Sequence, residues 1–388
     1  MSDKREFLGY HRPDGRVGVR NHVLVLSTGG LTGPTARRVG AALPGAVTVC
    51  LPHSSGLVGA DVRVHRQAVA GLAAHPNVGA ALLVGDNPAV MAQAAETLAA
   101  SGKPHAALTL DDCGHDALTL SDRALRAGAA LAIEASRARR APAPVAALTI
   151  GLECGRSDPS SGLVSNPLLG RVSDWLVDAG GTSMIGETLE WLGAEHLLER
   201  RARSPEVARA IREAVISREK LAVAHGIDLT GSNPTPTNVA AGLSSIEEKS
   251  LGNIAKSGAR PIEGVLPYGE APRRPGLWTM DASAYAPKSV TGFVMAGAQI
   301  VLFTTGVGNS YVSAVAPTLK LSANPRTCEA LRQQLDFDAG DAFRGRISLD
   351  DAAARLADRM IEIASGLATW GEVLGEGDEV TSRFAAAL

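Results

Sequence analysis

Residues 151–162 gather several chemically active side chains into one short stretch. The stretch reads GLECGRSDPSSG and holds Glu153, Cys154, Arg156 and Asp158. A thiol and carboxylates are common metal ligands, a guanidinium holds anions, and a glycine-rich turn lets backbone N–H groups approach a small anion. The alternative is a glycine-rich turn around a merely buried Cys154, and the glycines alone would favour it. The four side chains together favour a binding or catalytic site, with Ser157 beside them.

The neighbouring elements are expected to place this stretch at the edge of a sheet. An apolar run at residues 145–150 predicts a buried strand, and the spacing of residues 168–177 predicts a helix. The stretch would then lie between the end of a strand and the N-terminus of a helix. This is where α/β proteins usually bind their ligands.

A second group of acids follows the strand predicted at residues 182–186. Glu187 ends that strand, Glu190 lies about one turn later, and His196 follows along the predicted helix. Paired carboxylates near a histidine suit metal ligation, or proton transfer at a carbon next to a carboxylate. The alternative is a solvated helix start, where the helix dipole favours acids.

His53 stands just past the strand predicted at residues 47–52, so it is a candidate ligand or acid–base group. Lone histidines are more often structural, and both interpretations stay open. Residues 111–116 combine aspartates, a cysteine and a histidine, but their spacing matches no standard zinc pattern. We rank this cluster below residues 151–162.

Several side chains could hold an anionic substrate. Arginines surround the Pro-Asp-Gly turn at residues 13–15, either as a solvated hairpin or facing an anion. Lysines on the helix predicted at residues 243–256 could hold a carboxylate, although surface lysines are more common. The strand predicted at residues 299–305 ends in hydroxyl groups before a glycine-rich turn. The candidates are Arg12, Arg16, Arg20, Lys249, Lys256, Thr304 and Thr305.

Composition excludes several classes of protein. The chain has 388 residues, enough for two domains, and 38 basic against 40 acidic residues, so no basic excess would attract nucleic acid. Its four cysteines form no CxxC pair. No apolar run approaches the ~20 residues of a membrane span, and the charged start lacks an apolar signal region. We therefore expect a cytoplasmic protein that binds neither nucleic acid nor membrane.

Alternating strand and helix patterns define the fold class. Between residues 22 and 137 the alternation predicts a doubly wound parallel sheet. The basic, proline-rich stretch at residues 137–144 reads as a linker. We predict an α/β protein with two Rossmann-like domains and mostly parallel sheets, at residues 1–140 and 141–388. The glycine-rich turn at residues 28–33 lacks the G-x-G-x-x-G spacing, so no nicotinamide site is expected there.

Segments along nearly the whole chain resemble the D-galactarate dehydratase/altronate dehydratase family. They include GYHRPDGRVGVRN, GLECGRSDPSSGLVSNPLLGR, GETLEWLGAEHLL, NPTPTNVAAGLSSIEEKSLG and the stretch from SVTGFVMAGAQIVLFTTGVGN to APTLKLSANP. The resemblance implies elimination of water from a sugar-acid carboxylate, with iron or another divalent metal. A related branch, (2R)-sulfolactate sulfo-lyase, eliminates sulfite instead.

The chain also departs from the family pattern. It begins directly with the family's second domain, so the resemblance implies a large subunit with a small SAF-type partner, or a stand-alone variant. Thiols expected near Leu57 and in the loop at Gly85 and Asp86 are missing. These departures motivate one alternative, a non-catalytic binding subunit of the same fold.

We predict a metal-dependent hydro-lyase that converts a small sugar acid or hydroxy-carboxylate into a 2-keto acid. The alternatives are a sulfo-lyase acting on a sulfolactate-like substrate and the non-catalytic subunit. The expected cofactor is Fe²⁺, with Mn²⁺ as the other possibility, and a homo-oligomer is expected. The candidate residues, by role, are His53, Glu153, Glu190 and His196 for catalysis; Arg16, Arg20, Arg156, Ser157, Lys249, Thr304 and Thr305 for substrate binding; and Cys154, Asp158 and Glu187 for the metal.

Overall fold

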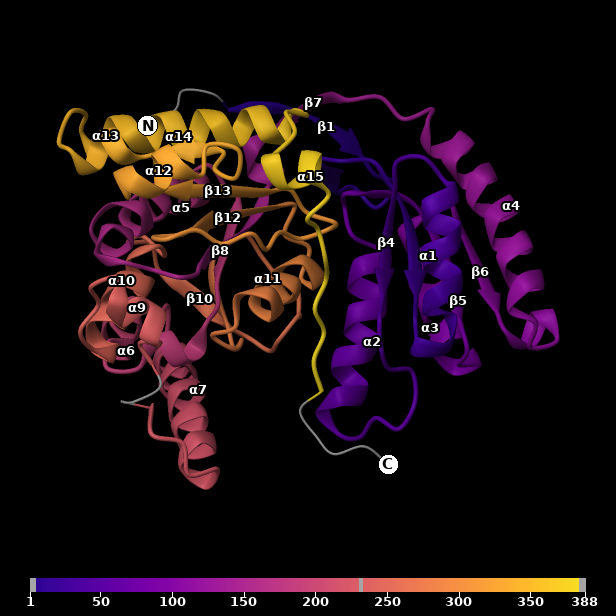
Figure 1. The fold of residues 1–388 in the computed structure, drawn as a ribbon, viewed down its shortest axis with the longest axis horizontal. Coiled ribbons are helices and arrows are strands. Elements are labelled where there is room, and N and C mark those ends of the chain that lie inside the picture. Colours follow the sequence, from indigo (N-terminus) through magenta and orange to yellow (C-terminus); the bar gives the residue numbers. More distant parts are fainter. Residues whose placement is uncertain (1–4, 230–232, 384–388) are drawn as a thin grey trace.

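The computed structural model describes residues 5–229 and 233–383, which form two α/β lobes and a small third sheet (Figure 1). The first lobe contains a four-stranded parallel sheet and the second a seven-stranded parallel sheet. This confirms an α/β fold with mostly parallel, Rossmann-like sheets. Residues 1–4, part of the charged start, lie outside the described residues. No helix within the described ranges has the length and apolar character needed to cross a bilayer.

In the first lobe, helices cover both faces of the sheet, whose strand order is β4-β3-β5-β6. The central strand β5 is buried at every residue, which matches its unbroken sequence VGAALLVG. Helices α1 and α4 pack on one face and α2 and α3 on the other. The elements are β3 (His22–Ser27), α1 (Gly33–Ala42), β4 (Ala46–Cys50), α2 (Ala60–Ala73), β5 (Val78–Gly85), α3 (Pro88–Ser101), β6 (His105–Thr109) and α4 (Ala117–Ala135).

In the second lobe, β8 lies in the middle of the sheet, with β9 on one side and β12 on the other; the order is β10-β11-β9-β8-β12-β13-β14. The strands are β8 (Thr149–Cys154), β9 (Thr182–Ile185), β10 (Ile262–Leu266), β11 (Gly276–Met280), β12 (Ile300–Thr304), β13 (Thr318–Ser322) and β14 (Phe337–Asp338). The helices are α5 (Asn166–Asp178), α6 (Glu195–Glu199), α7 (Pro205–Ala224), α9 (Pro236–Ala240), α10 (Ile246–Ala255), α11 (Ala286–Met295), α12 (Pro325–Ala330), α13 (Gly340–Phe343), α14 (Leu349–Ala364) and α15 (Trp370–Leu374).

Two expectations near the candidate site need correction. The strand predicted at residues 145–150 begins only at Thr149 and runs to Cys154, because β8 pairs in register with β12 up to Thr304 opposite Cys154. The helix predicted around residues 187–196 is broken into a 3-10 turn, η5 (Thr188–Trp191), and α6. Gly193, with φ +84°, lies at this break.

The predicted linker at residues 137–144 is partly a strand. Ala141–Pro144 forms β7, which pairs with β1 (Glu6–His11), and β1 in turn pairs with β2 (Val17–Gly18) in an antiparallel hairpin. Proline is tolerated in β7 because this strand lies at an edge of its sheet. The stretch therefore joins the lobes through a hydrogen-bonded sheet, and the domain boundary at residue 140 stays a prediction.

One hydrophobic cluster spans both lobes. Buried residues of α2 and of strands β3 and β5 pack in the same cluster as Met184, Phe293 and Val294 of the second lobe. Residues 376–383, which we call the C-terminal strap, run down between the lobes (Figure 1). Gly377 of the strap forms a bridge with Val312. The seam between the lobes is thus closed both by apolar packing and by the C-terminal strap.

Candidate active site

The carboxyl ends of β8 and β9 bring the predicted acids of the second lobe together. Glu153 and Cys154 are the last residues of β8, and Glu187 follows the end of the neighbouring strand β9. Glu190 lies in η5, which begins directly after Glu187. Because parallel strands end at one edge of their sheet, residues far apart in the sequence meet here.

Cys154, Glu187 and Glu190 form a buried cluster whose candidate ligand atoms lie within 4.8 Å of one another. Cys154 Sγ is 3.7 Å from Glu187 Oε2 and 4.0 Å from Glu190 Oε2. Asn253 Nδ2, on α10, donates to these three atoms at 3.4, 3.1 and 2.9 Å. Lys256, at the end of α10, donates to Cys154 Sγ at 3.3 Å and forms an ion pair with Glu187.

The surroundings shift the pKa values of Glu153 and Glu187 in opposite directions. Burial, together with the Glu187 carboxylate, raises the pKa of Glu153 well above that of an ordinary glutamate. Burial would also raise the pKa of Glu187, but Lys256 overrides it and lowers that pKa. No described residue donates a hydrogen bond of ordinary geometry to either Glu153 oxygen, although Ser289 lies nearby. Within this pair the proton is therefore favoured on Glu153 and the negative charge on Glu187.

Two lysines balance the acids of the cluster. Burial opposes the charge of Lys256, but the surrounding thiol and carboxylates raise its pKa above the ordinary value. Lys249 Nζ is 2.8 Å from Glu190 Oε1 and donates to Asn233 Oδ1 at 2.7 Å. Burial and Glu187 raise the pKa of Glu190, against the effect of Lys249. The site thus holds buried charges in pairs, as a water-poor interior requires.

The donor set fits a divalent metal ion. A thiolate suits softer ions such as Fe²⁺ or Zn²⁺, and carboxylates also suit Mn²⁺. Burial raises the pKa of the Cys154 thiol, so binding of a cation through sulfur would have to release its proton. Asn253 and Lys256 donate to the same sulfur and carboxylate atoms, so they and a metal ion would compete for them.

A cavity of about 290 Å³ lies beside the cluster, between residues 157–166 and residues 243–253. Lys249 and Asn253 belong to both the cavity wall and the cluster, so they connect the two. The walls approach closely at Gly162 and Gly252, where a Cβ on Gly162 would lie 3.3 Å from the Cα of Gly252. Other lining residues include Ser157, Leu163, Asn166 and Leu243.

Besides Lys249, two predicted substrate-binding residues lie on or behind this cavity, namely Ser157 and Thr304. Ser157 lines it directly. Thr304 is fully buried and donates to Asn166 Oδ1 at 2.6 Å, so it orients a side chain of the cavity wall. Thr305 Oγ1 instead accepts a hydrogen bond from the Gly308 N–H at 3.0 Å and stabilises the turn after β12.

Asp158, predicted as a metal ligand, is placed differently. Its Oδ1 accepts hydrogen bonds from the Ser160 hydroxyl at 2.6 Å and from the Ser161 N–H at 3.1 Å. Its Oδ2 accepts from Asn324 Nδ2 at 2.7 Å. The carboxylate therefore orders the turn that leads into the π-helical segment η4 (Ser161–Ser165), and it does not join the Cys154 cluster.

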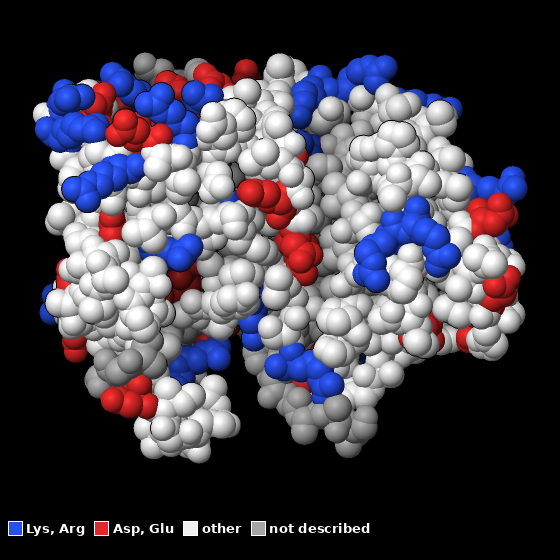
Figure 2. Space-filling view, viewed as in Figure 1, with Lys and Arg blue, Asp and Glu red and all other residues white. Residues whose placement is uncertain are grey.

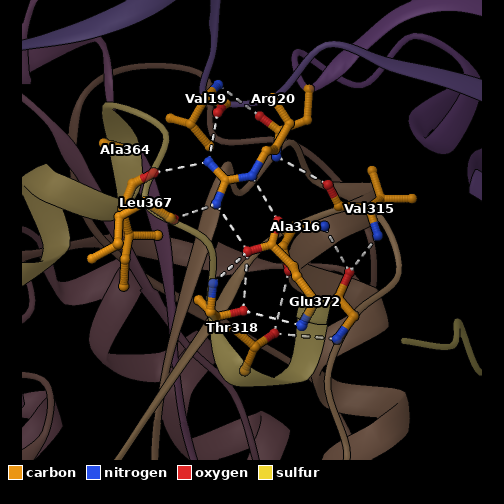
Figure 3. A network of polar contacts seen from close by, with 12 residues as sticks. Val19, Arg20, Val315, Ala316, Thr318, Ala364, Leu367 and Glu372 are labelled. Carbon is orange, nitrogen blue, oxygen red and sulfur yellow. Dashed lines mark hydrogen bonds and ion pairs between the residues drawn. The ribbon is translucent and has the colours of Figure 1, made fainter. Parts of the chain in front are cut away.

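The predicted arginines are not brought to the cluster either. Arg16 binds Asp14 and the Ala74 carbonyl, each at 2.6 Å. Arg20 binds both carboxylate oxygens of Glu372, at 2.6 and 2.9 Å, within a network that ties the segment between β2 and β3 to α15 (Figure 3). Arg156 is exposed, with a left-handed backbone (φ +55°). Arg20 acts as a structural anchor, because each of its guanidinium nitrogens is occupied; it also reaches the carbonyls of Val19, Ile363 and Leu367. Arg16 is exposed and is held by Asp14 and the Ala74 carbonyl away from the cluster.

The two predicted histidines lie elsewhere. His53 lines a small cavity with His65 of α2 and residues 381–383 of the strap. His196 is exposed on α6. Within the described ranges, one group of three or more His, Cys, Asp or Glu side chains has its ligand atoms close enough to share a metal ion, and it consists of Cys154, Glu187 and Glu190. Residues 111–116 therefore form no such group.

The sequence does carry a signal for the residues contributed by α10. Lys256 is among the carboxylate holders considered from the sequence, whereas Asn253 is not among the predicted site residues. Lys249, Asn253 and Lys256 recur at helical spacing, which places them on one face of α10. A polar stripe of this kind can face solvent or a buried site, and here it faces the cluster.

Two family models together match most of the chain. Residues 145–386 match the model described as D-galactarate/Altronate dehydratase, C-terminal. Residues 9–136 match D-galactarate dehydratase/Altronate hydrolase, second domain. The candidate cluster lies entirely within the first of these matches.

Full-length relatives agree with the family models. The chain is 36% identical to (2R)-sulfolactate sulfo-lyase subunit beta of Chromohalobacter salexigens, over 98% of each protein. It is 32% identical to altronate dehydratase of Bacillus subtilis, over 94% of this chain and 75% of that one. For altronate dehydratase of Escherichia coli the identity is 30%, over 95% and 76%. The chain therefore belongs to the D-galactarate/altronate dehydratase family, whose named members are lyases.

Proposed function

We propose that the protein is a metal-dependent lyase that removes water from a small sugar acid or hydroxy-carboxylate and yields a 2-keto acid. The observation that carries this proposal is the buried Cys154, Glu187 and Glu190 cluster beside a cavity of about 290 Å³. A hydrogen on the carbon next to a carboxylate is only weakly acidic. A divalent ion held by Cys154 and Glu187, Fe²⁺ or alternatively Mn²⁺, would stabilise the charge that develops when the proton leaves, while Glu190 stays available as the base.

The chain's own residues supply the remaining steps of the proposal. Lys249 Nζ would bind the substrate carboxylate from the cavity wall. Glu190 Oε1 would take the proton from the adjacent carbon, since its raised pKa makes it a stronger base. A carbon–carbon double bond forms as hydroxide leaves the next carbon, and the resulting enol becomes the 2-keto acid. Glu153 would hold its proton beside Glu187 and so limit the negative charge of the site.

A sulfo-lyase is the second candidate function. The observation in its favour is the 36% identity with a sulfo-lyase subunit over 98% of both chains. Elimination would follow the same course, with sulfite as the leaving group in place of hydroxide. Because that relative is named subunit beta, we also propose that this chain works with a small SAF-type companion subunit. Homo-oligomerisation and a cytoplasmic location stay predictions.

One assay separates these functions. The full chain, with and without a candidate companion subunit, is incubated anaerobically with Fe²⁺ or Mn²⁺ and a panel of aldarates, aldonates and sulfolactate. We expect a 2-keto acid from at least one aldarate or aldonate, and no sulfite from sulfolactate. Release of sulfite from sulfolactate would instead support the sulfo-lyase. Absence of any product from protein that carries metal and companion would contradict both, and favour a non-catalytic binding subunit.

A further inference from the structure

Glu187 has an unusual backbone for its residue type. Its φ of 63° and ψ of 52° place it in the left-handed helical region, and its side chain is only 1% exposed. Residues other than glycine, asparagine and aspartate rarely adopt this conformation, because their Cβ crowds the following carbonyl oxygen. Such a backbone persists only where the surroundings hold it.

The peptide groups on both sides of Glu187 are fixed by hydrogen bonds. Before it, the Gly186 carbonyl accepts from the indole N–H of Trp191 at 2.9 Å. After it, the Thr188 N–H donates to the Ala282 carbonyl at 3.0 Å. The Thr188 hydroxyl also accepts from the Ala282 N–H at 3.1 Å. The residue that follows Glu187 is thus joined to the end of β11 through its backbone and its side chain.

This attachment extends to α7 through Asp281. The Thr188 hydroxyl donates to Asp281 Oδ1 at 2.8 Å. Arg218, on α7, donates to the same oxygen from Nε at 3.1 Å and from Nη2 at 2.7 Å. The Asp281 N–H donates to the Leu266 carbonyl of β10 at 2.8 Å, so the aspartate is itself fixed to the sheet.

We infer that Thr188, Asp281 and Arg218 are positioning residues that hold Glu187 in its left-handed conformation and so aim its carboxylate at Cys154. None of the three belongs to the Cys154, Glu187 and Glu190 cluster. Lys256 holds the Glu187 carboxylate from α10, whereas this network holds its backbone from β11 and α7. The inference rests on the proposed function only where it concerns metal binding; the control of the Glu187 backbone is independent of it.

The test compares substitutions that differ in the hydroxyl of residue 188. Thr188→Val keeps the shape of the side chain but removes the hydroxyl's hydrogen bonds with Asp281 Oδ1 and the Ala282 N–H, and Thr188→Ser retains them. Co²⁺ affinity is measured from the absorption of the bound ion. We expect Thr188→Val to weaken Co²⁺ binding about 10-fold or more, and Thr188→Ser to bind Co²⁺ about as tightly as the unsubstituted protein. Asp281→Asn, at a half-exposed position, is the second variant should Thr188→Val fold poorly. Arg212→Ala is the control, because it removes a similar ion pair on α7, with Glu199, away from the cluster.

A crystal structure of Thr188→Val, or of Asp281→Asn, completes the test. We expect Glu187 to leave the left-handed region and its carboxylate to lose contact with Cys154. If Glu187 keeps its conformation and Co²⁺ affinity is unchanged, the inference is overturned. If the unsubstituted protein binds no metal while Glu187 moves in the variant, the metal-dependent function fails and the positioning inference stands. An equal loss of affinity in Arg212→Ala would also overturn it, since a general structural effect would then suffice.

Discussion

At the scale of single residues, the candidate site is a set of paired buried charges. Glu187 is paired with Lys256 and Glu190 with Lys249, and Asn253 donates to the cluster between them. Removing one member of such a pair leaves an uncompensated charge in a water-poor interior, which destabilises the protein more than removal of both. Substitution of a proposed metal ligand at these positions should therefore also lower local stability.

Conservative substitutions at the cluster test its role as a metal centre. Cys154→Ala or Glu187→Gln removes one ligand with little change in volume, so we expect metal content to fall from about one ion per chain to almost none. The measurements are metal analysis of the purified protein and far-ultraviolet circular dichroism, which should stay unchanged. Cys328→Ala is the control, because this buried thiol donates to the Ser322 carbonyl outside the cluster. Full metal content and activity in both cluster variants would contradict the assignment.

At the scale of elements, the C-terminal strap is attached to the second lobe by a buried acid. Glu379 is 6% exposed and accepts hydrogen bonds from the hydroxyl groups of Ser313 and Thr291. Its neighbour Val380 donates its N–H to the Thr291 hydroxyl at 2.9 Å. The strap continues to residues 381–383, which line the small cavity that contains His53. Glu379 therefore influences how firmly this segment joins the lobes.

The stability of this attachment should depend on pH. Burial raises the pKa of Glu379 to about 7, against about 4.3 for a glutamate in an unfolded chain. Because the folded state binds the extra proton, the contribution of Glu379 is fully present below about pH 4.3 and is lost as pH rises through about 7. Glutamine does not titrate. The free energy of unfolding of the unsubstituted protein should therefore fall, relative to that of Glu379→Gln, by on the order of 3 kcal/mol when the pH is raised from 5 to 8. Urea unfolding at both pH values measures this, and equal pH dependence of the two proteins would contradict it.

At the scale of the whole molecule, one apolar cluster spans both lobes, so we expect the lobes to unfold as one unit. Helix α2 of the first lobe approaches α11 of the second so closely that a Cβ on Gly71 would lie 2.3 Å from the Met295 carbonyl oxygen. Figure 2 shows a hollow between the lobes at the lower edge of the visible face, below the packed seam. The lobes therefore meet along the apolar cluster and diverge at that edge.

Substitution of Gly71 tests this coupling across the seam. Gly71→Ala should force α2 and α11 apart and lower the free energy of unfolding by about 1–3 kcal/mol. The tryptophans all lie beyond residue 174, in the second lobe, whereas Gly71 is in the first. We therefore expect tryptophan fluorescence and far-ultraviolet circular dichroism to report the same lowered midpoint. Two separate transitions, with an unchanged tryptophan signal, would show that the lobes unfold independently.

The sequence by itself determined the fold class and the core of the candidate site. Buried parallel strands are continuous apolar runs and helices repeat about every 3.6 residues, and both patterns are local. The rule that ligands gather at the carboxyl ends of parallel strands then selected Glu153, Cys154, Glu187 and Glu190. Local pattern failed at residues 141–144, because only pairing with β1 makes this proline-rich stretch a strand.

The tertiary structure decided which charged groups belong to the site. The sequence alone offers both Arg20 and Lys256 as candidate holders of an anion. In the structure Arg20 is paired with Glu372, outside the site, whereas Lys256 contacts Glu187 and Cys154 within it. Whether a charge is solvated, structural or part of a site depends on partners that are distant in the chain. Folding brings α10 against the end of β8, across about a hundred residues of sequence, and no local periodicity specifies that contact.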